Sequence, residues 1–480
     1  NPELIIFDEP TKDSIEDAKK CGVSLQTYAE VVKDGQKYRI EHKDVVEQEL
    51  EKGQWDDLAC IIFTSGTTGT PKGVQLSHGN FLTQLEELPE RIYVNPGDRA
   101  LSVLPIWHVF ERAVEYVIMI QGGVICYSKP IGSVLLSDFV KLNPVLLPAV
   151  PRVFEAIYDG IQRKMRKTGG IVYALFRFFV NVAIIHSRMH RKMFRQNPCY
   201  SRYYTGAWWV LFFIPWLLMW PLKFLGNLIV FRKIKAMLGK NFRAGVAGGG
   251  AFPPSIDEFF WAIGVKVVEG YGLTETSPVI GVETNTEFRV GSIGKCYPSL
   301  EVKILEPNED GIGELLVKGP TVMLGYYNNE EATKEAIVDG WFHTGDLAKI
   351  DEDGYIFIMG RKKSVIVLNN GKNVYPEEIE VMISNLDYVE ECMVFGQPRK
   401  ADDPLDLAVC LKVVYNPNVM KETYGATTLE EVEKVVRADV DKINDTMPTY
   451  KQITKIVVTD EEMVKTTTGK VKRFEETKKL

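Results

Sequence analysis

Short apolar runs alternate with amphipathic stretches along most of the chain. Between residues 56 and 155, and again between residues 244 and 290, runs rich in Val, Ile and Leu predict buried strands with helices between them. This alternation is typical of mostly parallel sheets flanked by helices. Residues 291–358 instead carry short strands between frequent glycine turns, so we expect a β-rich subdomain there. The pattern as a whole predicts an α/β protein.

The two ends of the chain carry smaller units. Ile5–Phe7 is strand-like and Val45–Gly53 has the pattern of a charged helix, so residues 1 to about 55 predict the end of one αβ unit. After Gly360 the pattern changes to that of a small α+β unit. Its predicted helices cover Val374–Leu386 and Leu429–Asp445, and its predicted strands cover Cys392–Phe395 and Ala408–Val414.

The run Ala207–Leu222 is apolar throughout and contains no charged residue. It is shorter than the roughly twenty residues that a membrane-spanning helix needs. Pro215 and Pro221 lack a backbone N–H and clash with the preceding turn, so they are expected to break or kink a helix in this run.

Charge is distributed unevenly around this run. The 480-residue chain has a net charge of −7, yet the window from Gly160 to Arg243 holds sixteen Lys or Arg and no Asp or Glu. Four of the eight tryptophans lie in the same window. Cations beside a Trp-rich apolar face suit an anionic layer of lipid headgroups. We therefore expect an insert of about residues 160–243 to attach the protein, as a peripheral or monotopic anchor, to anionic lipids at the cytoplasmic face of a membrane.

Other interpretations of the composition remain open or are disfavoured. The insert would also suit a buried helical hairpin whose cations are solvated. No recognition motif accompanies the basic residues, so nucleic-acid binding is not predicted. The seven cysteines are scattered without a CxxC pair, which indicates a reducing compartment and argues against a disulfide framework or a zinc site.

A loop rich in glycine and hydroxyl residues follows the predicted strand Ala59–Phe63. Glycines let the backbone approach an anion, and N–H groups and hydroxyls donate hydrogen bonds to it. The loop is not a Walker loop, because Gly73 rather than Ser or Thr follows its lysine. A flexible turn between two strands is the plain alternative. The candidate phosphate-binding residues are Thr64, Ser65, Gly66, Thr67, Thr68, Gly69 and Lys72.

Four further motifs follow in order, at 271–276, 340–346, 353–361 and 466–473. Together with the loop they resemble the signatures of the adenylate-forming superfamily, which includes acyl-CoA synthetases, peptide-synthetase adenylation domains and firefly luciferase. The resemblance extends over almost the whole chain. The segment Leu104–Arg112 resembles the long-chain fatty acid branch of bacterial and plastid type.

The resemblance implies a luciferase-like organisation. A large adenylating domain would cover residues 1–360, and a small mobile α+β lid would cover residues 361–480, with the hinge at Lys363. Members of this branch are considerably longer at the N-terminus. We therefore expect that the first part of the large domain, which supplies strands and part of the acyl pocket, is missing here.

The resemblance also implies a reaction in which a carboxylate and ATP form an acyl-adenylate and pyrophosphate, before the acyl group passes to a thiol. Tyr271 would stack on adenine, Thr274 would donate to the α-phosphate, and Glu275 would bind Mg²⁺. Asp346 would accept hydrogen bonds from the ribose, and Arg361 would reinforce that contact. Without the motifs, Glu275 and Asp346 would be interpreted as ordinary turn acids.

Three further residues receive roles by resemblance. Lys470 would reach both the carboxylate and the α-phosphate, although its neighbours alone would suggest a solvated tail lysine. His108 would lie at the mouth of the acyl site, with a core histidine as the alternative. Gly249, within a glycine cluster, would let the backbone lie against the base or the acyl chain. Arg112 stands where thermophilic relatives have a tryptophan gate, so no gate residue is transferred.

These observations predict a long-chain fatty acid–CoA ligase that uses ATP, Mg²⁺ and CoA as a co-substrate. A fatty acid–acyl-carrier-protein ligase is the closest alternative. More distant alternatives are an adenylating enzyme for aryl or amino acids, and a catalytically silent membrane-bound scaffold. The oligomeric state and the preferred chain length are not predicted.

Overall fold

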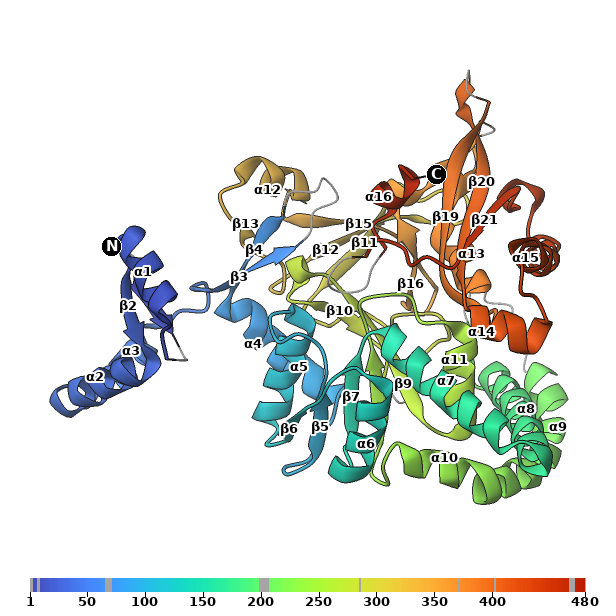
Figure 1. The fold of residues 1–480 in the computed structure, drawn as a ribbon, viewed down its shortest axis with the longest axis horizontal. Helices are drawn as coiled ribbons and strands as arrows, with labels where there is room; N and C mark the ends of the chain where they lie inside the picture. The colour runs from blue at the N-terminus through green and yellow to red at the C-terminus, as the bar shows by residue number, and fades with distance from the viewer. Residues whose placement is uncertain are drawn as a thin grey trace. The chain divides into compact units, whose positions relative to one another are not determined.

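The computed structural model describes residues 3–6, 9–64, 71–197, 207–284, 286–369, 371–400, 403–465 and 471–479. The chain forms two compact units, Asn1–Asp57 and Leu58–Leu480 (Figure 1).

The first unit contains two short parallel strands and three helices. β1 (Glu3–Ile6) pairs with β2 (Ser24–Thr27) across helix α1 (Lys12–Lys20). Helices α2 (Tyr28–Glu41) and α3 (Val45–Lys52) follow. The predicted strand corresponds to β1 as far as Ile6, while Phe7 lies outside the described residues, and the predicted charged helix is α3.

A six-stranded sheet lies at the centre of the second unit. Its strand order is β10-β9-β8-β7-β5-β6, and every pair is parallel except β9 with β10. The strands are β5 (Arg99–Ser102), β6 (Val124–Tyr127), β7 (Leu146–Ala149), β8 (Ala244–Ala247), β9 (Lys266–Gly272) and β10 (Val279–Val282). β7 and β10 are buried along their whole length, which explains their apolar runs.

Helices flank this sheet, as the alternating pattern predicted. They are α4 (His78–Glu87), α5 (Val109–Ile120), α6 (Gly132–Leu142), α7 (Pro151–Thr168) and α11 (Pro254–Ile263), and a short 3-10 helix, η1 (Leu88–Glu90), follows α4. Side chains of α7, α11 and the sheet share one buried cluster that includes Leu147, Phe154 and Phe260.

Two antiparallel sheets complete the large part of the second unit. One has the order β13-β4-β3 and contains β3 (Leu58–Thr64), β4 (Lys72–Ser77) and β13 (Gly325–Tyr326). The other contains β11 (Glu301–Leu305), β12 (Gly313–Lys318), β14 (Ile337–Val338), β15 (Trp341–Ile350) and β16 (Ile356–Arg361), with α12 (Glu330–Ala336) before β14. The β-rich subdomain predicted for residues 291–358 is therefore present.

The C-terminal part is the small α+β unit that the pattern predicted. β19 (Val389–Lys400), β20 (Asp403–Tyr415) and β21 (Lys455–Thr459) form its sheet, beside α13 (Pro376–Ile383) and α15 (Leu429–Asn444) (Figure 1). Its side chains form a core of their own. Smaller elements are the β17–β18 pair (Ile366–Val367, Asn373–Val374), α14 (Pro417–Val419), the π-helical turn η5 (Met420–Tyr424), η6 (Thr449–Lys451) and α16 (Arg473–Thr477).

The basic insert forms a helical hairpin. α8 (Gly170–Met193) packs against α9 (Ala207–Gly226), which continues through a π-helical turn, η2 (Asn227–Phe231), into α10 (Arg232–Met237). Of the two expected effects of the prolines, a break does not occur, because α9 runs through both, and a kink stays a prediction. Pro215 and Pro221 lie on the exposed side of α9, so the stripe that packs against α8 is preserved.

The helical stretch is also longer than the apolar run suggested. Gly170–Met193 and Trp209–Met237 are each long and apolar enough to cross a membrane by length and composition, a test that core helices of soluble proteins also pass.

Candidate functional site

Three predicted site residues from separate motifs meet at Asp346. The Tyr271 hydroxyl, at the end of β9, donates a hydrogen bond to Asp346 Oδ2, and Arg361 Nε lies 2.6 Å from Asp346 Oδ1. The sheet register sets the second contact, because Asp346 in β15 pairs directly with Arg361 in β16. The Asp346 carboxylate is buried, whereas the Arg361 guanidinium is nearly half exposed. The structure thus forms a charged, hydrogen-bonded cluster from segments 75 residues apart.

The backbone around Asp346 is held by two side chains. Thr344 Oγ1 accepts a hydrogen bond from Asp346 N at 3.0 Å and donates one to the Leu315 carbonyl at 2.8 Å. Gly345 has a φ of +68°, a conformation that glycine adopts without a steric penalty, and its N–H donates to Glu314. This explains the Thr-Gly-Asp order of the motif.

The Tyr271 hydroxyl stays protonated and so acts as a hydrogen-bond donor. Burial raises the pKa of the Tyr271 phenol well above its ordinary value, and the negative charge of Asp346 and the hydrogen bond to it add to this effect. The phenol therefore stays protonated at neutral pH and donates to the Asp346 carboxylate.

The second cluster joins Glu275 to Lys72 through a residue that the sequence did not single out. Tyr326 donates a hydrogen bond to Glu275 Oε1 at 2.9 Å, and Lys72 Nζ lies 4.7 Å from the centre of the Tyr326 ring. Tyr326 is placed by β13, which pairs with β4, the strand that begins at Lys72. No motif covers Tyr326, and its only sequence signal is an aromatic residue after Gly325.

Glu275 and Thr274 lie in the short 3-10 helix η3 (Thr274–Thr276) directly after β9. Thr276 Oγ1 fixes this turn, since it accepts from Leu273 N at 3.0 Å and donates to the Pro278 carbonyl at 2.6 Å. The Glu275 carbonyl accepts from Met323 N at 2.8 Å, just before β13.

The ends of the predicted phosphate loop are held opposite each other. Thr64 closes β3, Lys72 opens β4, and the two residues pair in the antiparallel register. The predicted contacts Ser65, Gly66, Thr67, Thr68 and Gly69 lie outside the described residues, as does Lys470.

His108 and Gly249 lie at the same edge of the central sheet as Tyr271. They follow β5 and β8, whose parallel strands end at the edge where β9 brings Tyr271. His108 caps α5, with its Nδ1 accepting from Phe110 N at 3.3 Å. A Cβ at Gly248 would lie 3.3 Å from the Phe110 ring, and Gly249 has a φ of +80°. Such edges bind ligands in open α/β sheets.

Glu111 is a further acid at this edge that the sequence analysis left without a role. It lies in the first turn of α5 and is 1% exposed. Burial raises the pKa of its carboxyl to about 7, and the charge of Glu115 adds to the rise.

This shift predicts a pH-dependent stability. The folded-state pKa of Glu111 lies above its unfolded value of 4.5. The contribution of Glu111 to the free energy of unfolding is therefore fully present below pH 4.5 and is lost as the pH rises through about 7. The loss amounts to about 3 kcal/mol. Glu111→Gln should therefore lose less stability than the parent between pH 5 and pH 8, measured by denaturant unfolding. Glu330→Gln, at an exposed helix start, is the control. Equal pH slopes for Glu111→Gln and the parent would contradict this prediction.

Lys363, the predicted hinge, lies in the 3-10 turn η4 (Lys362–Ser364) that follows β16. The neighbouring Lys362 Nζ contacts Glu314 Oε2 at 2.8 Å. The chain thus passes directly from Arg361 to the C-terminal part.

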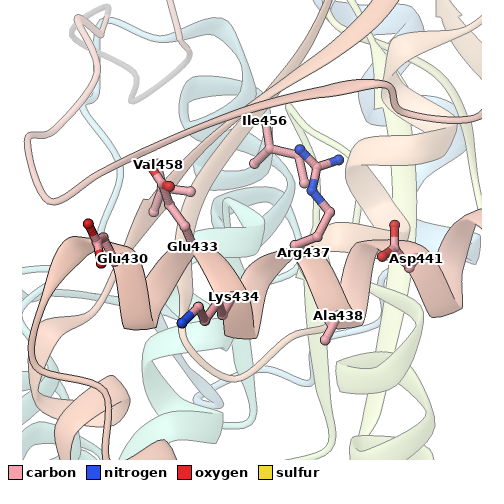
Figure 2. Close-up of a pocket in the computed structure, with 8 residues that line it drawn as sticks. All are labelled: Glu430, Glu433, Lys434, Arg437, Ala438, Asp441, Ile456 and Val458. Atoms are coloured by element: carbon pink, nitrogen blue, oxygen red, sulfur yellow. The ribbon is translucent and has the colours of Figure 1, made fainter.

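The C-terminal part also has a surface hollow, which is lined by other residues than the predicted site. It is bordered by one face of α15 and by β21, and none of the predicted site residues lines it (Figure 2). Its lining residues are Glu430, Glu433, Lys434, Arg437, Ala438, Asp441, Ile456 and Val458. Both acidic and basic residues line this open hollow, so its composition does not relate it to the Asp346 cluster or to the Glu275 cluster.

The fold is that of a known class. A central, mostly parallel sheet, two antiparallel sheets and a C-terminal α+β part form a fold that solved adenylate-forming enzymes share. The ATP-bound RpMatB-BxBclM chimera B1 has a TM-score of 0.66 at 22% identity, over 99% of this chain and 79% of that chain. O-succinylbenzoate CoA synthetase (MenE) from Bacillus subtilis, with the acyl-adenylate OSB-AMP, has a TM-score of 0.64 at 21% identity, over 99% and 78%. At these identities the likeness concerns the fold.

The chain belongs to the AMP-binding enzyme family, whose sequence pattern matches residues 2–327, and residues 363–480 match the AMP-binding enzyme C-terminal domain. The resemblance and fold class predicted from the motifs are thus confirmed.

Two relatives are of particular interest. The chloroplastic long-chain-fatty-acid–[acyl-carrier-protein] ligase AEE15 of Arabidopsis thaliana is 33% identical over 440 residues, or 86% of this chain and 60% of that protein. The long-chain-fatty-acid–CoA ligase FadD15 of Mycobacterium tuberculosis is 33% identical over 348 residues, or 72% and 53%. The chain therefore spans between about half and 60% of the length of these curated relatives.

Proposed function

We propose that this protein is an ATP-dependent, AMP-forming ligase that converts long-chain fatty acids to acyl-adenylates and then to acyl-CoA thioesters. The observation that carries the proposal is the meeting of Tyr271, Asp346 and Arg361 from three motifs in one partly buried cluster. The fatty acid specificity draws its support from relatives named as long-chain fatty acid ligases.

The Tyr271–Asp346–Arg361 cluster suits the nucleoside end of ATP. A carboxylate has about four lone-pair sites, so Asp346 could accept from two neighbouring ribose hydroxyls in addition to Tyr271 and Arg361. Arg361 pairs with Asp346 and holds it in position, and the flat face of Tyr271 offers a surface for the adenine ring.

The Lys72–Tyr326–Glu275 cluster suits the phosphates. Two anions, the fatty carboxylate and the α-phosphate, must meet, and fixed cations and donors offset their repulsion. Lys72 supplies charge near the outer phosphates, and Thr274 supplies a hydroxyl for the α-phosphate. Mg²⁺ is held in proteins by one or two carboxylates together with substrate phosphates, and the single carboxylate of Glu275 fits that donor set. Bound there, the ion would neutralise charge on the phosphates.

The second half-reaction would use the C-terminal part. In this proposal, residues 1–360 form the adenylating domain and residues 361–480 the lid, which turns at Lys363 after adenylation. The turn would withdraw Lys470 and bring the face at 371–375 to the site as a channel for CoA. Such alternation is a known form of hinge motion between compact units.

Acyl-carrier protein is the second candidate acceptor, because one relative is named as an acyl-carrier-protein ligase. A silent scaffold is disfavoured, since Lys72, Glu275, Asp346, Arg361 and Lys470 are all present.

Palmitate-dependent release of AMP from Mg-ATP tests the function, with CoA and acyl-carrier protein compared as acceptors. We expect AMP and acyl-CoA. Product with acyl-carrier protein alone would assign the enzyme to the second candidate. Absence of palmitate-dependent AMP with both acceptors would refute fatty acid activation.

We also propose that the enzyme works at the cytoplasmic face of a membrane, as a peripheral or monotopic protein. The support is the acid-free, basic and Trp-rich window from Gly160 to Arg243 together with its two apolar helices.

A further inference from the structure

The exposed side of the α9 helix is wholly apolar, and the helix packs along only one narrow stripe. Its less exposed positions recur at helical spacing and face α8: Phe212, Phe213, Trp216, Met219, Lys223 and Gly226. The remaining described positions of the helix are exposed, and they include Val210, Ile214, Leu217 and Leu218, each more than half exposed. Only 6% of the apolar window in Trp209–Met237 is buried. A helix that is hydrophobic all round belongs in a protein core or in a membrane.

Contacts between the two helices define an antiparallel hairpin. Lys192 of α8 lies over the ring of Phe212, and His186 stacks near Trp216 and contacts Lys223. Towards the start of α8, a Cβ at Gly226 would lie 2.9 Å from the Phe179 ring. Positions along α9 therefore rise as positions along α8 fall.

α8 is bound firmly to the body of the protein. Phe176, Phe179 and Ala183 belong to the buried cluster of α7 and α11. Arg191 forms a buried ion pair with Asp257 of α11 at 3.1 Å, and Arg188 pairs with Glu258 at 2.7 Å. Separating α8 from α11 would leave a buried charge without its partner, which is unfavourable in free energy.

The turn end of the hairpin is bound to the body as well. The Gln196 carbonyl accepts from Val290 N at 3.0 Å, and Arg195 lies 3.6 Å from Asp353. At the opposite end, α10 leads into β8, with Ile234 and Leu238 in the buried cluster. Because both ends are attached, the hairpin lies along the surface and does not project from it.

Charge around the exposed face points to an anionic partner. Exposed cations lie on the elements that adjoin α9 and η2: Arg177 on α8, and Arg232 and Lys233 on α10. No Asp or Glu occurs between Gly160 and Arg243. Trp209 and Trp220 are partly exposed within the apolar face, as is usual near lipid headgroups.

We propose that the outer face of α9 and η2 enters one leaflet of an anionic bilayer in the plane of the membrane, without crossing it, while the bordering cations contact lipid phosphates. This inference rests on the proposed function, because membrane attachment would let a fatty acid ligase take its substrate from the bilayer. Its test does not depend on catalysis.

Co-sedimentation with vesicles tests the surface. The parent should bind phosphatidylcholine vesicles that contain phosphatidylglycerol, and Ile214→Ser with Leu217→Ser and Leu218→Ser should weaken binding at least tenfold. Ile40→Ser with Leu50→Ser and Val140→Ser changes equally exposed apolar residues elsewhere and should bind like the parent. Arg232→Gln with Lys233→Gln should weaken binding to the anionic vesicles and reduce its salt dependence. The proposal would be overturned if the parent failed to bind the anionic vesicles, or if the α9 variant bound them like the parent.

Labelling distinguishes in-plane from spanning attachment. Gln196→Cys, with the native cysteines replaced by serine, should react with a membrane-impermeant maleimide added outside vesicle-bound protein. Protection of this position, with labelling after detergent is added, would show that the hairpin crosses the bilayer and would overturn the in-plane arrangement.

Two further measurements separate the surface from neighbouring proposals. Sedimentation without lipid should show the parent and the α9 variant at the same oligomeric state. If the parent self-associates through this face and does not bind vesicles, the face is an interface with a second copy of the chain. AMP release from submicellar fatty acid, without vesicles, should be the same for both proteins. A parent that binds vesicles but releases no AMP would refute the ligase proposal and leave the surface intact.

Discussion

Replacing Asp346 by asparagine is expected to lower kcat/KM for ATP by about 100-fold or more. Asp346 is a buried carboxylate that accepts from Tyr271 and pairs with Arg361 at 2.6 Å. An amide has one acceptor oxygen in place of two and turns an NH₂ group towards one of these donors. Hydrogen bonds to charged groups contribute about 1.5–3 kcal/mol each, and each 1.4 kcal/mol is tenfold.

Initial rates over a range of ATP concentrations measure this effect. Asp98→Asn is a matched control, because Asp98 also pairs with an arginine, Arg243, but lies before β5 and away from the cluster. We expect parent-like rates for that control. An Asp346→Asn enzyme with unchanged kcat/KM for ATP would exclude Asp346 from nucleotide binding.

Lys470→Ala is expected to abolish acyl-adenylate formation, with a loss of at least about 100- to 1,000-fold, while thioester formation from supplied acyl-adenylate continues. A cation aimed at the charge that develops in the transition state is worth this much in comparable sites. The lysine would be needed only while the carboxylate attacks the α-phosphate, so the second half-reaction should be spared.

Fatty-acid-dependent exchange of pyrophosphate into ATP reports the first half-reaction, and conversion of synthetic palmitoyl-adenylate with CoA reports the second. Lys472→Ala is the control, since Lys472 pairs with Glu475 on the surface. Equal loss of both half-reactions in Lys470→Ala would remove its assignment to adenylation.

Local features explain why much of the site was predictable. A phosphate loop needs glycines, hydroxyls and a cation within a few residues, and the Thr-Gly-Asp turn needs a glycine at positive φ. Such requirements are met within one segment, so they can be recognised in the sequence. The helix of α15 and the strands of the C-terminal sheet were predictable for the same reason, because periodicity is a property of consecutive residues.

Other features depended on distant segments. Tyr326 reaches Glu275 only because β13 pairs with β4, and the hydrogen bond joins residues 51 positions apart. Glu111 lies in a segment that was singled out, yet its raised pKa comes from burial by other elements. The absence of a break at Pro215 and Pro221 was not predictable, because it depended on which side of α9 faces α8.

The family, the α/β organisation, the order of the motifs and the acid-free apolar insert could all be recognised without the structure. These follow from composition and short-range spacing, which carry their physical meaning without the rest of the chain. The tertiary structure decided that Asp346 sits between Tyr271 and Arg361, that Tyr326 bridges Lys72 and Glu275, and that the insert lies along the body with one face of α9 exposed. Each of these depends on sheet register and helix packing, which bring together side chains that no local pattern relates.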